Sequence, residues 1–140
     1  MNIAIVTYEF EIEGGGLAHS CRRFYDMLTK LGHEVTVISS YLSPDSYICG
    51  GYDSSLNKSL AYEQKLKNDT RSHGPKTLII AFGGGFNGYY ASLLSNQLNC
   101  QFWLMLRGSD ANISKWDTEK SYYLQKALEN AGLVIGLSEE

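Results

Sequence analysis

The stretch LAHSCRRFYDMLTKLGHEVTVI, residues 17–38, decides the fold, because its hydrophobic pattern changes at a single glycine. Before Gly32, apolar residues recur at steps of four, three, four and three, which is the spacing of one helical face. They are Leu17, Cys21, Phe24, Leu28 and Leu31. After Gly32 comes a β-branched run over residues 34–38, which is typical of a strand. Gly32 itself stands where a glycine ends a helix, so we expect a helix followed directly by a strand.

The residues before this stretch predict another strand. Residues 3–8 are almost wholly apolar, which is typical of a strand buried on both faces of a parallel sheet. A polar loop over residues 9–16 joins this strand to the helix. Residues 2–39 therefore form a strand–helix–strand unit, whose crossover we expect to be right-handed.

The alternation continues along the chain. We expect strands at 77–82, 101–106 and 133–137, and helices over 88–98 and after Asp117 or Thr118, either of which can cap the helix that follows. The apolar face of that last helix consists of Leu124, Ala127, Leu128 and Ala131. Strands that alternate with helices predict an α/β fold: a Rossmann-like open parallel sheet in three layers, α/β/α.

Two parts of the chain depart from this regular pattern. Residues 40–76 have little periodicity, so we expect a weakly structured excursion with one polar helix around 54–68. The sequence ends two or three residues past the fifth expected strand, where a covering helix would follow. We therefore expect residues 1–140 to be a single domain that is truncated after this strand.

Composition argues against several classes of protein. The net charge of −3, with both signs interspersed, gives no basic footprint for nucleic acid. Cys21, Cys49 and Cys100 are too scattered for a disulfide framework or a zinc site, and the three histidines predict no metal site. No apolar run approaches the roughly 20 residues of a membrane span. We expect a cytoplasmic chain with no transmembrane segment, and peripheral attachment to a membrane stays open.

The turns that follow the strands are the candidate binding elements, because ligands of open α/β sheets bind at the carboxyl ends of the strands. Gly15 and Gly16 directly precede a helix, where free amide groups and the helix dipole favour a phosphate. An ordinary surface loop with a glycine bend explains the pair equally well. Glu9, Glu11 and Glu13 weaken the attraction for a bare phosphate and suit sugar hydroxyls better.

A second glycine turn lies in AFGGGFNGYY, residues 81–90. Gly83, Gly85 and Gly88 form a literal G-x-G-x-x-G after an expected strand, and Asp110 follows 22 residues later, near the spacing of a ribose-binding acid. This predicts a site for NAD or FAD. The motif stands alone, however, and four glycines in six residues match many patterns by chance. Dinucleotide binding therefore stays an alternative.

The turn from Arg107 to Asp110 is compact and polar after a very apolar strand. Arg107 can clamp a phosphate or carboxylate with its planar fork, and Asp110 can accept hydrogen bonds from hydroxyls. A pair between these two side chains that only holds the loop, or a plain Asx turn, is the other interpretation.

Taken together, these markers resemble the start of family 4 glycosyltransferases of the GT-B fold. The resemblance rests on Gly15-Gly16 at the start of a helix, on residues 30–38 (KLGHEVTVI), on residues 107–110 (RGSD) and on residues 131–139 (AGLVIGLSE). The markers occur in the order of the family and span almost the whole chain apart from residues 40–76.

The resemblance implies the acceptor-side half of a two-domain enzyme that moves a sugar from a nucleotide-sugar to a hydroxyl acceptor. Gly16 would approach the diphosphate of the donor through its backbone N–H. The acceptor cleft would be lined by Gly85, Asn87, Arg107, Ser109 and Asp110. Many relatives carry histidine at the position of Arg107, so we assign no catalytic residue.

This resemblance also sets what the chain needs in order to act. The donor-binding domain, often marked by E-x7-E, has no counterpart here. The chain would then be either an excised domain or half of a split enzyme whose partner is a separate C-terminal GT-B domain, and we expect little activity from this chain alone. The nucleotide-sugar is a co-substrate, and no other cofactor is implied. A non-catalytic binding domain of the same fold remains the third hypothesis.

Overall fold

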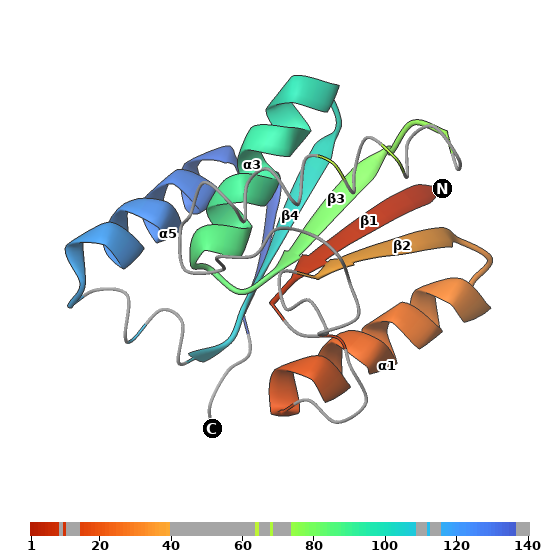
Figure 1. The fold of residues 1–140 in the computed structure, drawn as a ribbon, viewed down its shortest axis with the longest axis horizontal. Helices are drawn as coiled ribbons and strands as arrows, with labels where there is room; N and C mark the ends of the chain where they lie inside the picture. The colour runs from red at the N-terminus through yellow and green to blue at the C-terminus, as the bar shows by residue number, and fades with distance from the viewer. Residues whose placement is uncertain are drawn as a thin grey trace.

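The computed structural model describes residues 1–8, 10, 15–39, 64, 68, 74–108, 112 and 116–136. Within these ranges, five parallel strands form one sheet in the order β2-β1-β3-β4-β5 (Figure 1). The strands are β1 (Asn2–Thr7), β2 (Glu34–Ser39), β3 (Leu78–Phe82), β4 (Gln101–Leu106) and β5 (Leu133–Gly136). The helices are α1 (Gly16–Lys30), α3 (Phe86–Leu98) and α5 (Thr118–Asn130). The predicted open parallel α/β sheet is confirmed.

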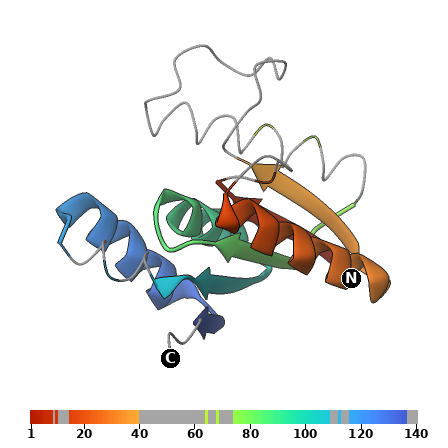
Figure 2. The ribbon, with the colours of Figure 1, turned by 90° about the horizontal axis from the view of Figure 1, so that it is seen from below.

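The sheet is the middle of three layers. In Figures 1 and 2, α1 lies on one face of the sheet, and α3 and α5 lie together on the other. Alternate residues of the central strands point to opposite faces, so Ile5 and Ile80 pack on the α1 side while Val6 and Ala81 pack on the α3 side. The central strand β3 is buried along its whole length, which explains its unbroken apolar sequence.

The strand order reverses between β1 and β3. The chain passes from β1 to β2 on one side of the sheet, whereas β3, β4 and β5 follow one another on the other side. The crevice outside the carboxyl ends of two such central strands is where open α/β sheets bind ligands. Both glycine turns predicted from the sequence follow these two strands, so both flank this point.

The predicted end of the first helix is confirmed, with one correction. Gly32 has φ 85°, and the N–H of His33 donates to the carbonyl of Leu28 at 3.1 Å, which is the bond of a Schellman motif. Leu31, however, is 67% exposed and does not belong to the buried face. It lies at the helix end itself, where the chain already turns toward β2.

The other two helices differ slightly from the prediction. Helix α3 begins at Phe86 instead of residue 88, because Gly85 takes the N-cap position. Helix α5 is capped as expected: the side chain of Asp117 accepts a hydrogen bond from the N–H of Lys120 at 3.0 Å. Of its predicted apolar face, Ala127 is fully buried, but Leu128 is 40% exposed.

An aromatic cluster joins α3 to α5. The rings of Tyr89 and Tyr123 stack with their centroids 5.0 Å apart, and Phe86 meets Tyr123 edge-on at 5.6 Å. Tyr122 lies beside Tyr89 at 5.8 Å. Such ring pairs add to the stability that burial alone supplies, so the two helices are held together near the starts of both.

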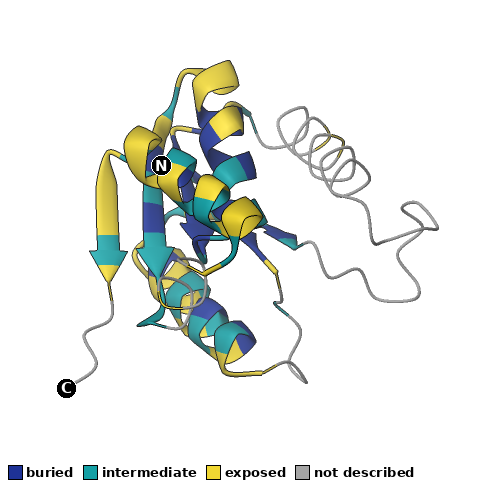
Figure 3. Ribbon diagram, turned by 90° about the vertical axis from the view of Figure 1, so that its left-hand side faces the viewer, coloured by how far each residue is buried: buried dark blue, intermediate teal, exposed yellow. Residues whose placement is uncertain are grey.

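The last strand is the exposed edge of the sheet. Figure 3 shows β5 largely exposed while the central strands are buried. Leu133 and Val134 are 41% and 42% exposed. The expected helix around 54–68 falls mostly outside the described residues. Within that range the structure describes only Gln64 and Asn68, and both are helical.

Candidate functional site

The start of α1 is the first candidate binding element. Gly15 is its N-cap, with no side-chain cap, and its first turn carries no acidic residue. Gly15 and Gly16 are both exposed. The first N–H groups of any helix have no acceptor within the helix, and the helix dipole adds partial positive charge at this end. The backbone groups at this end of α1 are therefore of the kind that bind anions, and a phosphate site there stays a prediction.

Arg107 extends from the end of β4 to this helix start. Its Nη2 atom lies 3.9 Å from the position that a Cβ atom would take at Gly16. Two of the predicted site residues, 91 positions apart in the sequence, are thus neighbours at the carboxyl edge of the sheet. A guanidinium and a helix N-terminus both attract anions, so these two neighbouring groups favour the same kind of ligand.

Phe10, which lies between β1 and α1 in the sequence, is bound by another arginine. The Nη2 group of Arg22 donates to the carbonyl oxygen of Phe10 at 3.2 Å, and the guanidinium carbon lies 4.2 Å from the centre of the Phe10 ring. Tyr25 meets the same ring edge-on at 5.4 Å. Arg22 therefore fixes Phe10 beside α1.

The glycines of the second turn mainly serve the packing of the chain. Gly83 has φ 104°, a backbone conformation that other residues rarely adopt. A Cβ atom at Gly84 would lie 2.6 Å from the side chain of Leu124. One at Gly88 would lie 2.8 Å from the carbonyl oxygen of Gly83 and 3.4 Å from the Cβ of Ala127. The fold alone thus explains three of the four glycines.

Gly85 is the exception in this turn. A Cβ atom there would meet nothing within 4 Å, and the residue caps the start of α3. Asn87 follows within the first turn of the same helix and is half-buried. Gly85 and Asn87 belong to the start of α3, and α3 lies on the face of the sheet opposite α1 (Figure 2).

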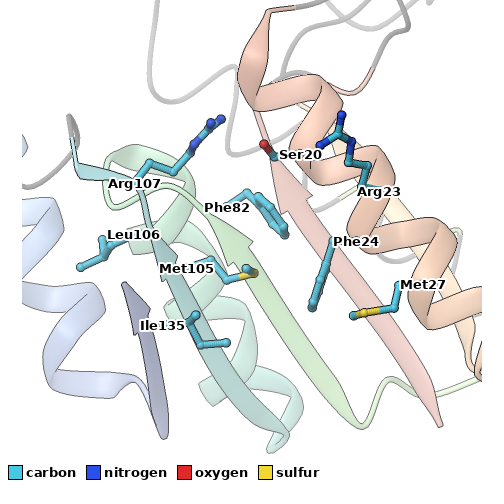
Figure 4. A pocket seen from close by; sticks show the side chains of 9 residues that line it. All are labelled: Ser20, Arg23, Phe24, Met27, Phe82, Met105, Leu106, Arg107 and Ile135. Atoms are coloured by element: carbon cyan, nitrogen blue, oxygen red, sulfur yellow. The ribbon is translucent and has the colours of Figure 1, made fainter. Parts of the chain in front are cut away.

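The structure also reveals a pocket that the sequence did not predict. It has a volume of about 310 Å³ and lies between α1 and strands β3, β4 and β5 (Figure 4). Its walls are mainly apolar, and they are formed by Phe24, Met27, Phe82, Met105, Leu106 and Ile135, with Ser20, Arg23 and Arg107 beside them. The apolar strand sequences were read as core, and only the three-dimensional placement of α1 shows that part of this face has no helix over it within the described residues.

The remaining predicted residues contribute less to a site. Ser109 and Asp110 lie outside the described residues, and so does any pairing of Asp110 with Arg107. His19 is exposed on the first turn of α1, and His33 lies near the amino terminus, with Nδ1 3.5 Å from the terminal nitrogen. Among the side chains that the structure describes, no three His, Cys, Asp or Glu residues gather as a metal site would require.

The buried thiol of Cys21 is poorly suited to act as a nucleophile at neutral pH. Burial raises its pKa to about 11, although a hydrogen bond with Thr7 and the charge of Arg22 act in the opposite direction. The thiolate is the reactive form of cysteine, so this side chain is almost wholly in its unreactive form at neutral pH. Its role is to pack between α1 and the sheet.

No helix in the described part of the chain combines the length and the apolar character that crossing a bilayer requires. No protein-family model matches the sequence, and no curated protein matches it.

Proposed function

We propose that this chain is the acceptor-side domain of a glycosyltransferase that moves a sugar from a nucleotide-sugar to a hydroxyl acceptor. Three features support the proposal: the Rossmann-like parallel sheet, the ordered set of sequence markers, and the approach of Arg107 to Gly16. The last carries the most weight, because it brings a guanidinium to within 3.9 Å of the Cβ position at the helix start where the markers predict the donor diphosphate.

The chemistry of glycosyl transfer fits these groups. As the bond between the sugar and the diphosphate breaks, negative charge develops on the leaving group. Amide groups at a helix N-terminus are fixed dipoles that stabilise such charge without having to reorganise. Gly16 has no side chain to keep the diphosphate away from these amides, and any larger residue would fill the space toward Arg107.

The acceptor lies, in this proposal, beside the diphosphate. Arg107 stands at the boundary between the two substrates, and Gly85 and Asn87 form the far wall of the crevice. Ser109 and Asp110 stay candidate acceptor contacts on the strength of the sequence alone, because they lie outside the described residues. The chain contributes position and charge. We assign no catalytic residue, and a second domain that binds the nucleotide completes the enzyme.

The test is a titration of the isotope-labelled chain with UDP, followed by the backbone amide signals in NMR spectra. We expect the signals of Gly15, Gly16 and Leu17 to move, because their amide groups point toward the anion. The variant Gly16→Val should weaken this binding by about tenfold or more, because its side chain blocks the approach. The matched control is Gly136→Val on β5, where an added Cβ atom also meets nothing within 4 Å, and it should bind UDP as the unchanged chain does.

An absence of any change at the α1 amides, or an equal response from Gly16→Val, would contradict the proposal. Circular dichroism of both variants shows whether they are folded.

Dinucleotide binding is the second candidate, and one observation favours it. Gly83 makes a turn at positive φ, Gly85 leaves open space and Gly88 allows close helix packing, which are the three roles of the glycines in a dinucleotide fingerprint. If NAD moves the amide signal of Gly85 and the variant Gly85→Val abolishes that change, this function replaces the first.

A further inference from the structure

We draw no further inference here: the strongest candidate, the tyrosine cluster formed by Tyr89, Tyr122 and Tyr123 where α3 and α5 begin, leaves Tyr122 49% exposed, but nothing in the structure shows what covers it.

Discussion

Gly88 lies so close to Gly83 that a Cβ atom at Gly88 would be 2.8 Å from the carbonyl oxygen of Gly83. The neighbour is backbone, which cannot move aside as a flexible side chain would. The same Cβ would press on Leu104 at 3.1 Å. This contact lets the start of α3 pack against the sheet and α5, and it gives the glycine motif a structural role that does not depend on any ligand.

The variant Gly88→Ala should therefore lower the free energy of unfolding by about 1–3 kcal/mol, because overpacking shifts α3 away from the sheet. Urea denaturation measures the change. Gly85→Ala is the matched control, and it should cost less than about 1 kcal/mol, because its Cβ meets open space and only the preference at the N-cap changes. Equal losses in the two variants would show that the close contact does not matter.

A substitution at Gly32 tests the effect of the backbone conformation alone, because the new side chain contacts nothing. The φ of Gly32 is 85°, and an added Cβ would meet nothing within 4 Å. Gly32→Ala should destabilise the chain by about 1–2 kcal/mol, because the left-handed conformation is unfavourable for residues with a Cβ atom. Asn tolerates this conformation better, so Gly32→Asn should lose clearly less in the same urea experiment. A loss from Asn as large as that from Ala would argue against this account.

The cap of α5 should contribute measurably to stability. The carboxylate of Asp117 accepts from the N–H of Lys120 at 3.0 Å, and Asp117→Ala removes this acceptor. We expect a loss of about 1 kcal/mol in thermal or urea denaturation, and a smaller loss for Asp117→Asn, whose side-chain oxygen can still accept. An unchanged stability in Asp117→Ala would show that water replaces the cap without cost.

Cys21 should make stability fall at alkaline pH. Burial raises the pKa of its thiol from 9.0 to about 11, so the folded chain holds this proton more tightly than the unfolded chain does. The stability that this more tightly held proton gives the folded chain is complete below pH 9. It is lost as the pH rises from 9 toward 11, by up to about 2–3 kcal/mol. Comparing the unfolding free energy of the unchanged chain with that of Cys21→Ala at pH 8 and pH 10.5 isolates this effect from other titrating groups. A difference between the two chains that stays constant with pH would contradict it.

Local features of the fold were predictable because their causes are local. The end of α1 at Gly32 and the cap at Asp117 depend only on residues within a turn of each, and the structure has both. Leu31 matched the helical spacing but is exposed, because the chain leaves the helix at that residue and the spacing no longer applies. The spacing of apolar residues predicts a buried helical face only within the helix itself.

The candidate site was predictable only in part. The turns after the strands were expected at one edge, but the strand order β2-β1-β3-β4-β5 depends on tertiary pairing, and it is in this order that Arg107 lies beside Gly16. The pocket was not predicted at all, because Met105 and Ile135 have the same apolar sequence context as buried core residues. They line the pocket because α1 covers only part of the width of the sheet. Spacing also could not separate Gly88, which packs, from Gly85, which faces open space.

The position of β1 in the sheet affects how the fold responds to insertions and deletions. Ile3 pairs with Val35 on one side and with Leu78 on the other, so the same strand closes one short and one long connection. The entropy lost on closing a connection grows only with the logarithm of its length, by about 0.6 kcal/mol for each doubling. Halving or doubling the chain between β2 and β3 therefore changes the cost of this pairing very little. A change of length before Gly74 therefore costs this pairing little, whereas Lys76 and Thr77 have fixed places, because their side chains bond to Thr36 and Asn2.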